Sequence, residues 1–172
     1  MKIAIIDVET TGLDPVKNEI IEIGAVIFDD EIAGSLQTVN IKVKPEHPEI
    51  ETDGAYKVNG YKKEDWKDAV TMEQAMQILS PKVDGAIFCA YNMVFDWQFI
   101  EQACKKLFIM LPFHYRKLDL LTMAWAKLDH KKVRNWKLKS VCKALGIEPE
   151  PEEHRAINGA MTEYEVYKQL MK

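Results

Sequence analysis

Residues 1–8, MKIAIIDV, open the chain with a nearly continuous apolar run that ends in an acid. Such a run is typical of a β-strand buried on both faces. The turn cluster TTGLDP follows at residues 10–15, and the β-branched run EIIEIGAVIFD at residues 19–29 predicts a second strand. Residues 37–43 predict a third strand. Because the connections are short, the three strands should form an antiparallel meander.

The rest of the chain predicts one further strand and several helices. Residues 86–90, AIFCA, predict a short buried strand, whereas residues 45–63 look irregular. Apolar residues recur at helical spacing within residues 72–79, 99–107, 118–128, 138–145 and 156–171. Gly146 follows the fourth of these segments and is a candidate helix C-cap. Together these elements predict an α/β fold with mixed strand directions.

Composition limits the kind of protein this can be. With 172 residues, 47% hydrophobic and 29% charged, the chain suits a single domain over residues 1–172. Its three cysteines have no CxxC spacing, which is typical of reduced thiols in a cytoplasmic protein. No stretch approaches the ~20 apolar residues of a membrane span, so we expect no membrane partner.

The net charge of −4 does not indicate a nucleic-acid binder, but it hides an asymmetry. Residues 101–145 hold eleven Lys and Arg against three acids, which gives +8 and leaves −12 elsewhere. A basic segment that lies beside a cluster of acids suits a groove that binds the phosphate backbone of a nucleic acid. A solvated helical face explains the individual residues about as well. Trp66, Trp97 and Trp125 are expected to be packing residues.

Three acids follow the ends of predicted strands. Asp7 and Glu9 lie two residues apart, so both side chains should be on one face of the first strand. Asp96 opens a predicted helix and could be an N-cap or a first-turn acid. Taken alone, each acid is explained by solvation or capping. If the strands are neighbours, however, the acids converge and need a hard cation such as Mg²⁺ or Mn²⁺.

The order of these motifs resembles the histidine branch of the DEDD-type 3′ to 5′ exonucleases, which includes the proofreading epsilon subunit of bacterial DNA polymerase III and ribonuclease T. Residues 6–15, IDVETTGLDP, are similar to the first motif of this family. Residues 91–96, YNMVFD, resemble the second motif, and residues 154–157, HRAI, resemble the start of the third. The resemblance extends over essentially the whole chain.

The resemblance implies a ribonuclease H-like fold, with a mixed five-stranded sheet flanked by helices and a fifth strand near residues 113–118. It implies two divalent cations, Mg²⁺ or Mn²⁺, held by Asp7, Glu9 and Asp96, with His154 as the general base. The implied substrate is a 3′ end of single-stranded DNA or RNA, cleaved to nucleoside 5′-monophosphates. The residues implied to contact the terminal nucleotide are Thr10, Thr11, Leu13, Asn92 and Phe95. A polymerase or a second copy of the chain is the implied protein partner.

The chain departs from the family at one position. The third motif runs His-x-Ala-x-x-Asp, and its aspartate falls at Gly159. Asn158 is turned by ~100° around the helix from that position, and Glu163 begins ~6 Å further along the axis, so neither replaces the acid in an obvious way. The sequence therefore predicts a metal-dependent exonuclease with impaired activity. The alternative is a non-catalytic nucleic-acid-binding module that keeps the fold.

Overall fold

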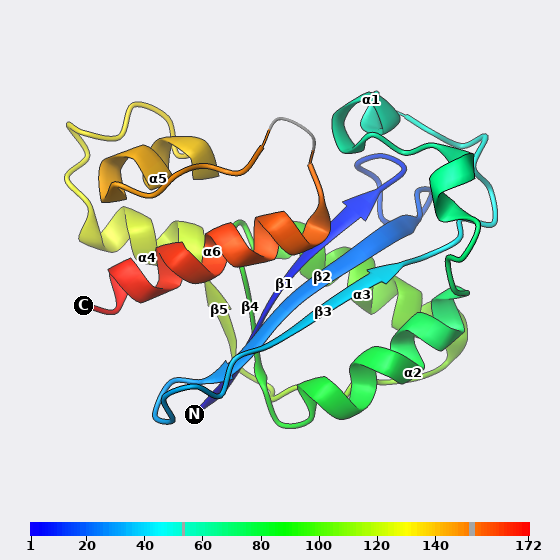
Figure 1. Cartoon of the computed structure of the whole chain (residues 1–172), viewed down its shortest axis with the longest axis horizontal. Coiled ribbons are helices and arrows are strands. Elements are labelled where there is room, and N and C mark those ends of the chain that lie inside the picture. Colours follow the sequence, from blue (N-terminus) through cyan, green and yellow to red (C-terminus); the bar gives the residue numbers. More distant parts are fainter. Residues whose placement is uncertain (53, 152–153) are drawn as a thin grey trace.

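A computed structural model describes residues 1–52, 54–151 and 154–172 of the chain. In this described part, five strands form one sheet in the order β3-β2-β1-β4-β5 (Figure 1). The strands are β1 (Lys2–Thr10), β2 (Ile20–Asp29), β3 (Gln37–Lys42), β4 (Ile87–Ala90) and β5 (Lys117–Asp119). Strands β1, β2 and β3 pair antiparallel, whereas β4 is parallel to β1 and to β5. The mixed sheet and the meander are confirmed.

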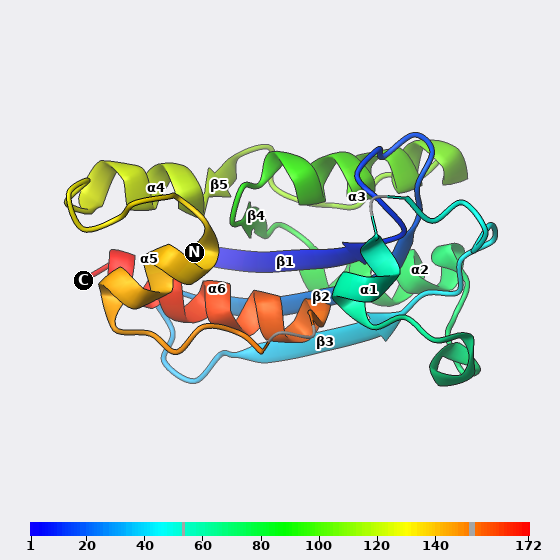
Figure 2. The same cartoon turned by 90° about the horizontal axis from the view of Figure 1, so that it is seen from above.

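Helices cover both faces of the sheet (Figure 2). They are α1 (Ala55–Asn59), the 3-10 helix η1 (Lys63–Trp66), α2 (Met72–Val83), α3 (Val94–Leu107), α4 (Leu120–Lys127), α5 (Leu138–Leu145) and α6 (Ala156–Leu170). Helices α2 and α3 pack on one face, and α4 and α6 pack on the other, where α5 lies against them. Among the described residues no helix is long and apolar enough to cross a membrane.

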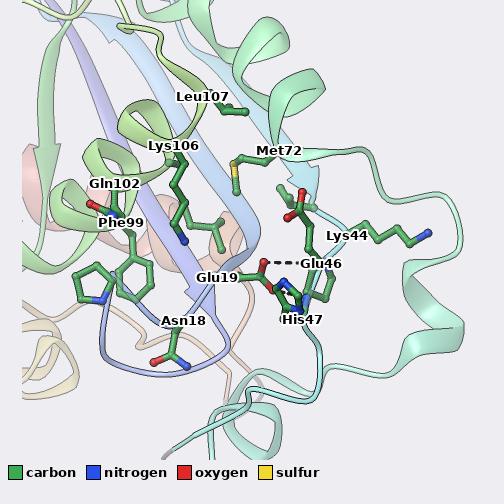
Figure 3. A pocket seen from close by; sticks show the side chains of 15 residues that line it. Asn18, Glu19, Lys44, Glu46, His47, Met72, Phe99, Gln102, Lys106 and Leu107 are labelled. Atoms are coloured by element: carbon green, nitrogen blue, oxygen red, sulfur yellow. Dashed lines mark hydrogen bonds between the residues drawn. The ribbon is translucent and has the colours of Figure 1, made fainter.

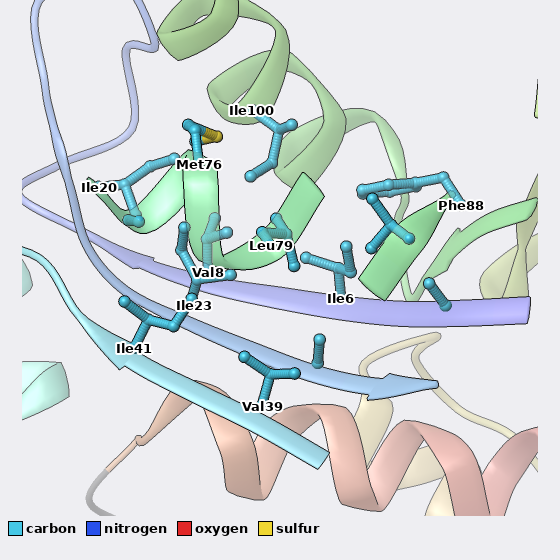
Figure 4. Close-up of a cluster of buried hydrophobic side chains, with 14 of the residues drawn as sticks. Ile6, Val8, Ile20, Ile23, Val39, Ile41, Met76, Leu79, Phe88 and Ile100 are labelled. Atoms are coloured by element: carbon cyan, nitrogen blue, oxygen red, sulfur yellow. The ribbon is translucent and has the colours of Figure 1, made fainter. Parts of the chain in front are cut away.

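The larger hydrophobic core fills the space between the sheet and helices α2 and α3 (Figure 4). Strand β1 contributes Ile6 and Val8 to it, and β4 contributes Phe88. Leu79 of α2 and Ile100 of α3 pack against these strands. Side chains alternate across a strand, so the intervening residues of β1 point to the α6 face.

On the opposite face, α6 approaches the sheet so closely that one position must be glycine. A Cβ atom on Gly24 of β2 would collide with the backbone of Ala156 and Ile157 at the start of α6. Because the colliding atoms are backbone, no side-chain rotation would relieve the clash. Gly24 therefore sets how near the first turn of α6 comes to β2, and Asp7 is its partner across the β1–β2 ladder.

The predicted elements match the observed ones with two differences. The fifth strand is three residues long and lies at Lys117–Asp119 rather than near residues 113–118. Residues 45–63 are not wholly irregular, because they contain α1 between Gly54 and Gly60, both in the left-handed conformation. Gly146 is the C-cap of α5, with φ of 72°, as expected.

Candidate active site

The candidate site lies where β1 and β4 end beneath the first turns of α6. Asp7 and Glu9 continue the row of Ile3 and Ile5 on the α6 face of β1, as the period of two predicts. Because β1 and β4 are parallel neighbours, their carboxyl ends meet at one edge of the sheet. The loop after β4 leads into α3, which carries Asp96 in its first turn.

Asp96 is joined directly to β1. Its side chain is buried, with 4% of the residue exposed, and its Oδ1 accepts a hydrogen bond from the backbone N–H of Val8 at 3.0 Å. Met93 occupies the N-cap position of α3, so Asp96 is a first-turn acid and not the cap. The structure thus brings Asp96 to the strand that carries Asp7 and Glu9.

Gly159 faces Asp7 from α6. An ideal Cβ on Gly159 would lie 2.6 Å from Oδ2 of Asp7 and 2.7 Å from its Cγ. The carboxylate of Asp7 therefore occupies the space that a side chain at position 159 would fill. This geometry places position 159 at the site, as the motif spacing predicts, and leaves it without a functional group.

The acids of the candidate site have pKa values above their usual range, and burial is the largest cause for each of them. Burial, followed by the negative charges of Asp96, Glu163 and Glu9, raises the pKa of Asp7 well above its usual range. Burial and the charge of Glu22 raise the pKa of Glu9 to about 8. Burial raises the pKa of Asp96 to about 7, although its hydrogen bond from Val8 opposes the shift. The site therefore holds more negative charge than its protein surroundings neutralise.

A set of carboxylate oxygens that repel one another suits a hard divalent cation. In the described part of the chain, however, no three acidic, histidine or cysteine side chains are already arranged around one point that a metal could occupy. The donor chemistry fits the expected cations, and the present side-chain positions are not those of a closed metal site.

His154 lies beside an acid that the sequence analysis did not single out. Its Nδ1 is 3.3 Å from Oε1 of Glu150, and its backbone N–H donates to the carbonyl of Val58 at 3.3 Å. The charge of Glu150 also reaches Asp7 and Glu9, where it raises their pKa values. Residues 150, 151 and 154 are not helical, so no helical spacing in the sequence indicated this pair.

A buried ion pair fixes the start of α6, and this pair was also missed. Arg155 donates from Nε to Oε2 of Glu22 at 3.0 Å and from an Nη atom to Oε1 at 2.9 Å. Glu22 is 1% exposed, and the guanidinium also lies over the ring of Trp66 at 5.2 Å. This two-point contact between β2 and α6 orients the backbone that carries His154.

The five predicted nucleotide-contacting residues fall into two groups. Thr10 donates to the carbonyl of Gly12, and Thr11 accepts from the N–H of Glu19, so both hydroxyls bind the turn itself. Phe95 packs against Phe99 with ring centroids 5.0 Å apart. The other two residues are open to solvent, namely Leu13, which is 65% exposed, and Asn92, whose φ is 60°.

Part of the basic segment, residues 101–145, lies beside His154. A cavity of about 380 Å³ lies between α5 and residues 149–151 and 154. Lys137 and Lys139 line it together with Glu150 and His154. A second cavity, of about 340 Å³, lies between β2, α2 and α3 (Figure 3), where Glu19 accepts from the N–H of His47 at 2.9 Å. None of the predicted site residues lines this second cavity.

The chain belongs to the exonuclease family whose model, RNase_T, matches residues 4–167. It is similar to the PolC-type DNA polymerase III of Thermotoga petrophila, with 32% identity over 95% of this chain and 11% of that protein. It is also similar to the epsilon subunit of DNA polymerase III from Pasteurella multocida, with 28% identity over 94% of this chain and 63% of that subunit. The predicted family is thus confirmed, and the chain spans only part of these relatives.

Solved structures share the fold. The nuclease domain of 3′hExo, a DEDDh family member bound to rAMP, superposes with a TM-score of 0.78 and 18% identity over 99% of this chain and 91% of that one. Exonuclease I of E. coli in complex with a dT13 oligonucleotide gives 0.74 and 16% identity over 99% of this chain and 40% of that one. At these identities the likeness establishes the ribonuclease H-like fold.

Proposed function

We propose that this chain is a metal-dependent 3′ to 5′ exonuclease domain that removes nucleoside 5′-monophosphates from single-stranded DNA or RNA. The observation that carries the proposal is the convergence of Asp7 and Glu9 with Asp96, which is hydrogen-bonded to the same strand. Membership of the exonuclease family supports it. The whole span 1–172 acts as one such domain.

Asp7, Glu9 and Asp96 would hold two divalent cations, Mg²⁺ or Mn²⁺. When bound, such cations neutralise charge on the scissile phosphate and lower the pKa of the attacking water. His154 would accept the proton of that water. Its Nδ1 lies 3.3 Å from Oε1 of Glu150, so this carboxylate can orient the imidazole and stabilise it once it has taken the proton.

The substrate would approach across the basic segment. Lys137 and Lys139 line the same cavity as His154, so their charges can attract the phosphates next to the 3′ end. The exposed Leu13 and Asn92 would contact the terminal nucleotide, together with Thr10, Thr11 and Phe95. Oligonucleotide and nucleotide complexes of proteins with this fold are consistent with such a substrate.

Gly159 favours a second function, a non-catalytic nucleic-acid-binding module. A domain that lost turnover with its fourth acid would keep the sheet, the helices and the basic cavity. A domain that binds nucleic acid and cleaves it slowly would be intermediate between an active exonuclease and this binding module. The polymerase relatives favour a polymerase as the protein partner, with a second copy of the chain as the alternative, and the free cysteines suit the cytoplasm.

Degradation of 5′-labelled single-stranded DNA and RNA with Mg²⁺ or Mn²⁺ tests the proposal. The chain should shorten the labelled oligonucleotide from its 3′ end and release nucleoside 5′-monophosphates. Asp7→Ala should abolish this degradation. Gly159→Asp should increase the rate if the missing acid limits it. If neither the chain nor Gly159→Asp shortens any substrate, while both still bind it, the binding module replaces the exonuclease.

A further inference from the structure

Glu163 is a buried acid without a full set of partners. It lies on α6 four residues after Gly159, and 2% of it is exposed. Its Oε2 is shielded from solvent and has no hydrogen-bond partner among the described residues. An unpaired polar atom in the interior is unfavourable, and more so if it is charged. A fold keeps such an atom where a ligand is missing or where function requires it.

The neighbours of Glu163 are the acids of the site. Its charge raises the pKa of Asp7, and the charge of Asp96, after burial, raises the pKa of Glu163 itself. On its other side Glu163 reaches the end of β4, where the Tyr91 backbone hydrogen-bonds to it and its charge acts on Cys89. The charges that raise the pKa of Glu163 most strongly are those of other acids, namely Asp96, Glu150 and Asp119. The unpaired oxygen thus lies among carboxylates.

Helix geometry directs this side chain toward position 159. Residues i and i+4 lie on one face of a helix, and helical side chains point back toward the N-terminus. The glutamate side chain is also one methylene longer than that of aspartate. Gly159 contributes no side chain, and the Asp7 carboxylate occupies the space beside it, so no side chain at position 159 separates Asp7 from the next turn of α6, which carries Glu163.

We infer that Glu163 supplies the fourth carboxylate ligand of the divalent-cation site, from one turn further along α6 than the position that is glycine here. The inference rests on the proposed exonuclease function. In this arrangement the fourth carboxylate comes from position 163 instead of position 159, and its oxygen joins the same cluster of acids. The chain would then carry a complete set of four acids: Asp7, Glu9, Asp96 and Glu163.

Calorimetric titration of Mn²⁺ into metal-free protein tests this ligand directly. Glu163→Gln should bind Mn²⁺ at least about tenfold more weakly than the unaltered chain. The matched control is Glu165→Gln, two residues away on the same helix, where the side chain is exposed and pairs with Lys168 at 2.7 Å. This control should bind as the unaltered chain does. Metal-free Glu163→Gln should melt at the same or a higher temperature, because it removes an unpaired buried acid.

A rescue variant separates ligation from structure. Glu163→Gln combined with Gly159→Asp should recover Mn²⁺ binding, because the acid is returned at the family's position. Equal Mn²⁺ affinity of Glu163→Gln and the unaltered chain would overturn the inference but leave the exonuclease proposal on three carboxylates. Binding only after Gly159→Asp would also overturn it. If no variant binds Mn²⁺ and none degrades an oligonucleotide, the proposed function fails as well.

Discussion

The two faces of β1 begin alike and end differently. The face toward α2 and α3 stays apolar as far as Val8, whereas the face toward α6 changes after Ile5 to Asp7 and Glu9. The first face is filled by side chains that need no partner. The second ends in acids that the protein surroundings leave short of positive charge.

This difference shows how one strand serves both stability and a site. Apolar packing on the α2–α3 face holds β1 in place, so the opposite face can keep repelling carboxylates at its end. The α6 face needs a different attachment at this end, and the Arg155–Glu22 pair together with the close approach at Gly24 provides it. Substitutions on one face should therefore affect stability differently from substitutions on the other.

Removal of the arginine should have the largest effect. Arg155→Met leaves the Glu22 carboxylate buried without its guanidinium partner, which should lower the free energy of unfolding by about 3–5 kcal/mol. Urea denaturation followed by circular dichroism measures the change. The double variant with Glu22→Gln should recover most of the loss, because no unpaired charge remains. If the double variant is as unstable as Arg155→Met, apolar packing of the arginine stem and not charge pairing attaches α6.

On the opposite face, Ile6→Ala removes a fully buried side chain from the larger core. It should lower the free energy of unfolding by about 2–5 kcal/mol, through lost burial and the cavity that remains. Mn²⁺ affinity, measured by calorimetry on the folded protein, should not change, because this side chain points away from the acids. A large loss of Mn²⁺ affinity would show that the two faces of β1 are coupled.

These contrasts also explain which features could be predicted from sequence. The strand β1, the position of Asp7 and Glu9 on one face and the Gly146 cap depend on local patterns, and all three are found. Strand β5 has only three residues, too few for a pattern, so its predicted position was shifted. Trp125 was expected to pack, yet it is 50% exposed beside His130 and Trp136.

The missed site features are long-range contacts. The Glu22–Arg155 pair joins residues 133 positions apart, which no spacing in one sequence reveals. Glu163 was considered and set aside because it begins a turn beyond position 159. Its burial and its unpaired oxygen become visible only when α6 is packed against β1 and β4. Sequence motifs predicted the candidate site, and the packing of α6 led us to infer that Glu163 is its additional acid.

The pH dependence of stability should distinguish the two faces without any substitution. Carboxyls whose pKa is higher in the folded than in the unfolded protein bind protons more tightly when folded. Their contribution is therefore full below the unfolded values near 4 and is lost as pH rises toward about 7 for Asp96 and about 8 for Glu9. Asp7, Glu150 and Glu163 shift in the same direction, whereas the charge of Arg155 opposes the shift of Glu9.

In EDTA, the free energy of unfolding should thus fall between pH 5 and pH 8, as measured by urea denaturation. Asp96→Asn should make this dependence shallower, because its amide oxygen can still accept from Val8 but no longer titrates. Added Mn²⁺ should raise stability at pH 8 more than at pH 5, since cations compete with protons for the same oxygens. Stability that rises from pH 5 to pH 8 in EDTA would contradict the repulsion between these acids.

The smallest expected effect comes from removing two positive charges near His154. Lys137 and Lys139 line the cavity that contains His154, so Lys137→Gln with Lys139→Gln should weaken binding of a single-stranded oligonucleotide several-fold at low salt. If each lysine contacts one phosphate, the slope of log affinity against log salt should become shallower by about 1.4. Fluorescence anisotropy in Ca²⁺ or EDTA measures both quantities without cleavage. The control Lys62→Gln, exposed and outside residues 101–145, should change neither; an equal effect there would mean that the lysines act only through net charge.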